Sequence, residues 1–183
     1  YPRERAHYGD VGYVHIGRVI SSDLKQVHKM GLDGYISCQE LRVVFPNALP
    51  NYVMGYTLFD ESAGPQALIQ EYFSAAYGER ADQVLSYLNE LSTLSSCDYL
   101  NGKGARTDPA IAERMEQISR LCRSVSLDAP KDGSPLFWEI LQYHREYILA
   151  ISRAMGALAG GNSRPAAHGG AEVRDLSCKN DDT

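Results

Sequence analysis

The stretch GLDGYISCQELRVVFPNALPNYVMGYTLF, residues 31–59, decides the expected fold because its pattern changes repeatedly over a short distance. Gly31 is placed to end a preceding helix in the left-handed conformation, and an Asp-Gly turn sequence follows it. The next apolar residues suit a buried strand over 34–38, and a proline suits the first turn of a short helix over 50–60. Helix, turn, strand and helix together form one repeat of an α/β fold.

The strand predicted at 34–38 is the only convincing one in the sequence. A lone strand leaves its backbone N–H and C=O groups unpaired, so it needs neighbouring strands. We therefore expect its sheet partners upstream of Tyr1, in a longer polypeptide. The lack of an initiator methionine at Tyr1 fits the same interpretation.

The remainder of the sequence has helical periodicity, with apolar residues three and four positions apart. Residues 16–30 show this pattern before the strand, and Asp108 and Ser134, each followed by proline, are helix starts after it. His144 lies on the apolar face of the last helix and is predicted to be a core residue bonded to a backbone carbonyl. The positions expected to form the core of a helical bundle include Val84, Leu85, Leu88, Ile118 and Ile148.

Composition excludes several classes of function. The chain has 183 residues and a formal net charge of −5, whereas nucleic-acid-binding domains are usually basic, so no nucleic acid partner is expected. No apolar run approaches the length of about 18–20 residues that a membrane-spanning helix needs, so no membrane partner is expected either. The cysteines and histidines are too scattered for a disulfide framework or a metal site, and no cofactor is predicted.

Four segments resemble a bacterial family of domains of unknown function in carbohydrate-active proteins. Residues 33–42 (DGYISCQELR) and 49–58 (LPNYVMGYTL) resemble its opening part. Residues 71–78 (EYFSAAYG) and 138–147 (WEILQYHREY) are similar to its entry into a helical domain and to its long late helix. The resemblance covers about residues 15–160 and implies relatives of the α-glucuronidases, in which a (β/α)8 barrel precedes a helical carboxyl-terminal domain.

The resemblance implies a mainly α fold in which a helical bundle follows the terminal β/α piece of a probable (β/α)8 barrel. Residues 1–62 would hold the last β/α unit or units of the truncated barrel, 65–160 the bundle and 161–183 a flexible tail. Strand 34–38 would be the last barrel strand, and the helix over 50–60 would close the barrel. The tail departs from the family, which has a further amphipathic helix there.

Glu40 follows the predicted strand at the end where barrels place catalytic groups. Glycoside hydrolysis normally uses two carboxylates, so the second would have to come from the missing part of the polypeptide. Gln39 and Arg42 are candidates for binding sugar hydroxyls or a uronate carboxylate. The alternative is that Glu40 pairs with Arg42 or is solvated in a loop.

Two hypotheses about function follow. The parent protein is an enzyme that hydrolyses polysaccharides or uronides, with Glu40 contributing to its site, or this part is a structural module that packs on the barrel or supports dimerisation. We favour the second for this chain because it holds no complete catalytic set. The expected partners are the missing amino-terminal barrel of the same polypeptide, a second copy in a homodimer and a carbohydrate ligand.

Overall fold

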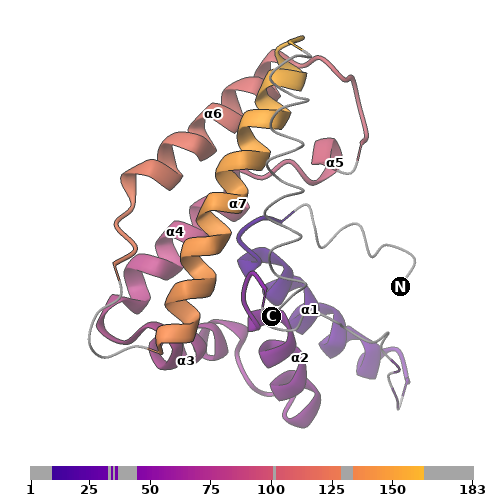
Figure 1. Ribbon diagram of the computed structural model, residues 1–183. Coiled ribbons are helices and arrows are strands. Elements are labelled where there is room, and N and C mark those ends of the chain that lie inside the picture. Colours follow the sequence, from indigo (N-terminus) through magenta and orange to yellow (C-terminus); the bar gives the residue numbers. More distant parts are fainter. Residues whose placement is uncertain are drawn as a thin grey trace. The chain divides into compact units, whose positions relative to one another are not determined.

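A computed structural model describes residues 10–32, 34, 36, 45–100, 102–128 and 134–162 (Figure 1). The structure is mainly helical there, as expected, with α1 (Val14–Lys29), α2 (Leu49–Phe59), α3 (Pro65–Tyr77), the 3-10 turn η2 (Gly78–Arg80), α4 (Ala81–Leu94), α5 (Cys97–Leu100), α6 (Pro109–Ser124) and α7 (Pro135–Ala159). No strand occurs among the described residues. Gly34 and Ile36 are not in a strand, and the rest of the predicted strand lies outside the described residues.

The chain forms two compact units. The first, called here the α1–α4 unit, comprises Gly12–Ser92 and Asp128–Leu141. The second, the α6–α7 unit, comprises the described residues within Tyr1–Val11, Thr93–Leu127 and Gln142–Thr183. Helices α1 to α4 thus belong together, whereas the sequence placed a domain boundary before α3. That boundary concerns a longer polypeptide and stays a prediction.

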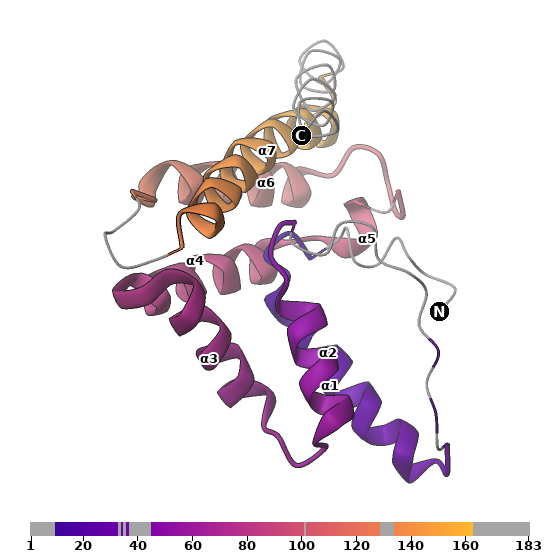
Figure 2. The ribbon, with the colours of Figure 1, turned by 60° about the horizontal axis from the view of Figure 1, so that its bottom comes forward.

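Helices α1 and α2 lie side by side and run parallel (Figures 1 and 2). Gly17 of α1 faces Leu49 of α2, since a Cβ added to this glycine would lie 3.5 Å from the Leu49 Cγ, at ordinary contact distance. Further along, the buried hydroxyl of Thr57 donates to the buried hydroxyl of Ser21 over 3.3 Å. Residues further along α1 contact residues further along α2. The carboxyl ends of the two helices therefore lie at the same end of the unit.

The start of α2 is held by side chains from its own unit. The amide of the buried Asn47 accepts from the Leu49 N–H over 3.2 Å and donates to the Gly12 carbonyl over 3.3 Å. The Tyr72 hydroxyl of α3 accepts from the N–H of Ala48, the N-cap residue, over 2.9 Å. Burial raises the pKa of the Tyr72 phenol to about 12, so the phenol stays protonated at neutral pH. These bonds fix where α2 begins.

The core of the α1–α4 unit is aromatic. Tyr77 and Trp138 meet edge to face with ring centroids 5.4 Å apart, and Tyr72 and Phe137 do so at 6.1 Å. The Arg80 guanidinium lies over the Trp138 ring, 5.5 Å from its centroid. The core positions predicted for α4 are confirmed, because the structure buries Val84, Leu85 and Leu88.

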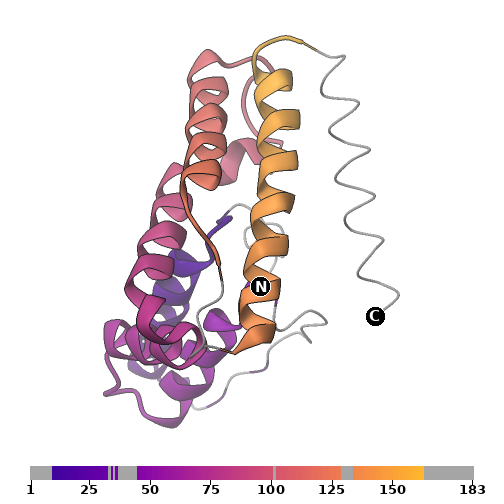
Figure 3. The ribbon, with the colours of Figure 1, turned by 60° about the vertical axis from the view of Figure 1, so that its left-hand side comes forward.

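In the α6–α7 unit, α6 packs antiparallel to α7 (Figures 1 and 3). Asp108 caps α6 as predicted, and its carboxylate accepts from the Ala110 N–H over 2.9 Å. The hydroxyls of Ser119 and Ser152 bond across the two helices at 2.7 Å in a buried position. The remaining predicted core positions are confirmed by the burial of Ile118 and Ile148.

Candidate functional site

Helix α2 is apolar on every side, which distinguishes it from an ordinary surface helix. Its sequence, LPNYVMGYTLF, contains no charged residue. One face, with Leu49, Pro50, Val53 and Thr57, is buried. A helix that is apolar all round is normally buried all round, so the opposite face of α2 is unusual in being open to solvent.

The open face of α2 carries a groove of about 500 Å³, lined by Asn51, Tyr52, Gly55, Tyr56 and Phe59. The three aromatic residues follow the helix repeat at positions i, i+4 and i+7, which places them in one row. The rings of Tyr52 and Tyr56 are tilted by 41° with centroids 4.6 Å apart. The groove therefore presents aromatic faces and edges, one amide and the bare backbone of a glycine.

The phenol of Tyr52 joins the groove to α3. Burial raises its pKa, and hydrogen bonds with Glu71 and Tyr56 raise it further. The Tyr52 hydroxyl therefore stays protonated. Glu71 of α3 thus lies near a lining residue of the groove.

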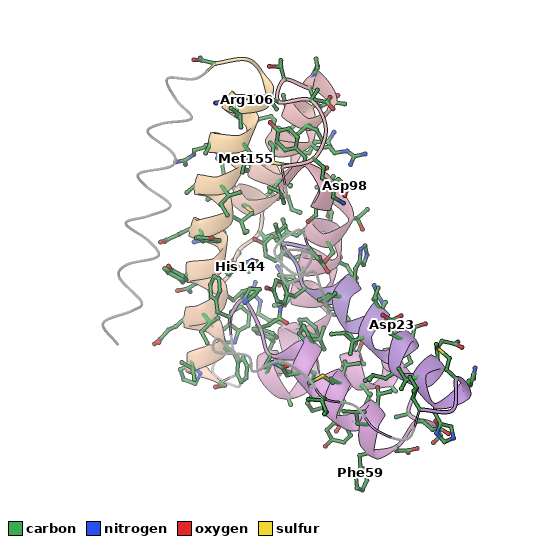
Figure 4. The ribbon with its side chains drawn as sticks, turned by 90° about the vertical axis from the view of Figure 1, so that its right-hand side faces the viewer. Asp23, Phe59, Asp98, Arg106, His144 and Met155 are labelled. Carbon is green, nitrogen blue, oxygen red and sulfur yellow. The ribbon has the colours of Figure 1, made fainter. Side chains whose placement is uncertain are left out.

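Four large apolar side chains at or just beyond the ends of α1 and α2 are exposed. Phe59 is 91% exposed and Met30 73%, and they are joined by Leu58 at 54% and Leu32 at 52%. Figure 4 shows Phe59 pointing away from the rest of its unit. We call these four residues the apolar end. Ile36, in the segment that follows α1, is also exposed.

The site predicted from the sequence cannot be compared with this geometry. Glu40, Gln39 and Arg42 lie outside the described residues, and their roles stay predictions. The sequence analysis also did not single out the α2 groove. A signal for it was present, because Tyr52, Tyr56 and Phe59 recur at helical spacing around a glycine.

Other kinds of site find no support in the part of the chain that the structure describes. It holds no group of three His, Cys, Asp or Glu side chains that could bind a metal ion. None of its helices is long and apolar enough to cross a membrane. His144 is a buried core residue, as predicted; burial lowers its pKa to about 4, and its hydrogen bond with the Val11 backbone acts in the opposite direction.

Comparison with known proteins adds no assignment. No protein-family model matches the chain, and neither a curated protein nor a solved structure is significantly similar to it.

Proposed function

We propose that this chain is a non-catalytic helical module of a larger glycoside-hydrolase-like polypeptide, and that it packs against the barrel of that polypeptide. The observation that carries the proposal is the apolar end, where four large apolar side chains are more than half exposed. The resemblance of residues 33–42, 49–58 and 71–78 to proteins with a barrel and a bundle supplies the barrel as the partner. The carboxyl ends of α1 and α2 belong to the segment in which that resemblance expects the last barrel repeat.

Covering the apolar end would be strongly favourable. Burying one side chain of this size completely contributes about 1.5–3 kcal/mol. Leu58 and Leu32 are already about half covered, so covering all four would contribute several kcal/mol, a large share of the stability of a small domain, about 5–15 kcal/mol. Apolar surface that is exposed in a patch marks an interaction surface more often than scattered single residues do.

Catalysis by this chain alone is not part of the proposal. Glu40, Gln39 and Arg42 would serve a site only together with groups from the rest of the polypeptide, since glycoside hydrolysis normally needs two carboxylates. We expect the purified chain to turn over neither aryl-glycosides nor aryl-uronides. Turnover that disappears in Glu40→Gln would contradict the non-catalytic assignment.

Docking is tested by the accessibility of Phe59→Cys in the chain alone and in the longer polypeptide that contains it. A maleimide reagent labels accessible thiols, and peptide mass spectrometry reads the label at each position, so the native cysteines do not interfere. The matched control is Glu90→Cys, at an exposed position on α4 in the same unit. We expect Phe59→Cys to react rapidly in the chain alone and slowly in the longer polypeptide, with Glu90→Cys reacting rapidly in both.

Two outcomes would overturn the docking proposal. One is equal labelling of Phe59→Cys in both contexts. The other is protection of Phe59→Cys in the chain alone, at concentrations where sedimentation shows a dimer. The second outcome would assign the apolar end to contacts between two copies of the chain.

A further inference from the structure

The four residues of the apolar end differ in chemistry, because Met30 alone among them carries a group that a mild oxidant converts. The thioether sulfur of methionine takes up one oxygen atom and becomes a sulfoxide, which turns a flexible apolar side chain into a polar one. Leu32, Leu58 and Phe59 have hydrocarbon side chains and do not react in this way. Oxidation can therefore change the polarity of the apolar end at one position.

Met30 is also the most accessible of the four methionines in the chain. It is 73% exposed, whereas Met115 is almost completely buried. Met54 and Met155 are half-buried. An oxidant has to touch the sulfur atom, so the most exposed methionine reacts first. The structure thus favours the oxidation of Met30 over that of the three others.

The end of α1 does not depend on the side chain of Met30. The backbone N–H of Met30 donates to the carbonyls of Gln26 and Val27, over 3.0 Å and 3.2 Å. Beyond it, the N–H of Leu32 donates back to the Val27 carbonyl over 3.3 Å. These bonds use backbone atoms only, so an oxygen atom added to the Met30 sulfur would leave the helix end intact and would change the surface alone.

Resting on the proposed docking, we infer that Met30 is a redox switch: its oxidation in the undocked state keeps the apolar end from docking on the barrel. The oxidant is a peroxide. Hydrogen peroxide transfers one oxygen atom to the sulfur, the thioether loses two electrons, and the rest of the peroxide leaves as water. A methionine sulfoxide reductase reverses the step, because two thiols supply the electrons and become a disulfide while the oxygen leaves as water.

Docking and oxidation oppose each other at this position. In the docked state the barrel would cover Met30 and shield its sulfur from the oxidant. Once the sulfur is oxidised in the undocked state, docking would bury a polar sulfoxide oxygen. A buried polar group that lacks a hydrogen bond shifts an equilibrium by about 5- to 150-fold. Oxidation would therefore move the polypeptide to the undocked state, and reduction would return it.

The first test measures which methionine reacts. The chain alone is treated with hydrogen peroxide, and peptide mass spectrometry follows the gain of one oxygen atom at each of the four methionines. We expect Met30 to be oxidised first and Met115 last, in the order of their exposure. In the longer polypeptide Met30 should react more slowly than in the chain alone, because docking covers it.

The second test measures docking after oxidation, through the maleimide labelling of Phe59→Cys in the longer polypeptide. Dithiothreitol restores the oxidised thiol before labelling and does not reduce methionine sulfoxide. We expect peroxide treatment to raise the labelling rate about 5-fold or more, and a methionine sulfoxide reductase to reverse the increase.

Three variants in the Phe59→Cys background sharpen the second test. Met30→Leu stays apolar and has no sulfur, so peroxide should no longer raise the labelling rate. Met155→Leu, in the α6–α7 unit, is the matched control and should keep the response to peroxide. Met30→Gln places a polar amide at this position without any oxidant and should raise the labelling rate in the untreated polypeptide.

Three results would overturn the inference: preferential oxidation of another methionine in the chain alone, labelling of Phe59→Cys that peroxide leaves unchanged, or an increase that persists in Met30→Leu. Each leaves the docking proposal standing as long as Phe59→Cys is protected before treatment. Equal labelling of Phe59→Cys in the chain alone and in the untreated longer polypeptide would instead overturn the docking proposal, and the switch with it.

Discussion

Helices α2 and α6 differ in how much of their apolar surface is covered. In α6 the apolar residues form one stripe, and Ile111, Met115, Ile118 and Cys122 along it are buried. The other side of α6 is polar and charged, so the helix needs no further partner. Helix α2 is apolar on both sides, and only the side with Leu49 and Val53 is buried. The difference teaches that α6 has its apolar stripe covered within its own unit, whereas α2 keeps a second apolar face open to solvent.

The largest expected difference in stability comes from replacing one apolar side chain on each helix by alanine. Met115→Ala should lower the free energy of unfolding by about 2–5 kcal/mol, because the side chain is almost completely buried. Phe59→Ala should change it by less than about 0.5 kcal/mol, because the ring is exposed. Urea unfolding of both variants measures the contrast. Similar losses for the two would mean that Phe59 is covered within the chain itself.

The second-largest effect is on the pH dependence of stability, and it arises from His144 in the unit that contains α6. The pKa of the buried His144 is lowered from 6.5 to about 4, so the unfolded chain binds more protons than the folded one between these pH values. Neutral His144 contributes fully to the free energy of unfolding above pH 6.5. This contribution is lost as the pH falls towards 4, and the loss amounts to about 3 kcal/mol. His144→Gln cannot titrate, so its unfolding free energy should fall less steeply over this range. Equal pH dependence of the two proteins would contradict the buried neutral state.

A smaller effect is expected where α2 begins. Tyr72→Phe removes the hydroxyl that accepts from the Ala48 N–H and should lower the free energy of unfolding by about 1 kcal/mol. Amide exchange at Ala48 should accelerate at the same time. Tyr87→Phe, in α4 of the same unit, is a comparison that leaves this contact intact. Unchanged exchange at Ala48 would show that α2 does not depend on this bond.

The smallest effect compares two helical glycines. Gly55→Ala on the open face of α2 should raise the free energy of unfolding by about 0.5–1 kcal/mol, since the methyl group meets nothing and alanine favours the helix. Gly156→Ala on α7 should give less or no gain, because its Cβ would lie 3.2 Å from the Met115 Cβ. Thermal unfolding of the two variants measures the difference. A larger gain at Gly156 would mean that the seam between α6 and α7 is looser than the structure indicates.

Some positions show that the apolar periodicity of a helix does not predict how deeply each residue is buried. Val19 and Leu24 lie on the same predicted face of α1, yet Leu24 is buried and Val19 is half exposed. A hydrophobic pattern identifies the side of a helix that suits burial, but only the neighbouring helices decide how much of that side is covered. The tyrosines show the same limit. Tyr77 is in the core, whereas Tyr56 lines an open groove.

The sequence by itself determined the helices and much of their cores, because the signals for them are local. Proline after Asp108 begins α6, glycines follow the ends of α1 and α3, and apolar residues three and four apart define the inner faces. The parallel pairing of α1 with α2 and the open face of α2 were decided by tertiary structure. Both depend on contacts between residues far apart in the chain, such as Asn47 with Gly12 and Tyr72 with Ala48, which no local pattern specifies.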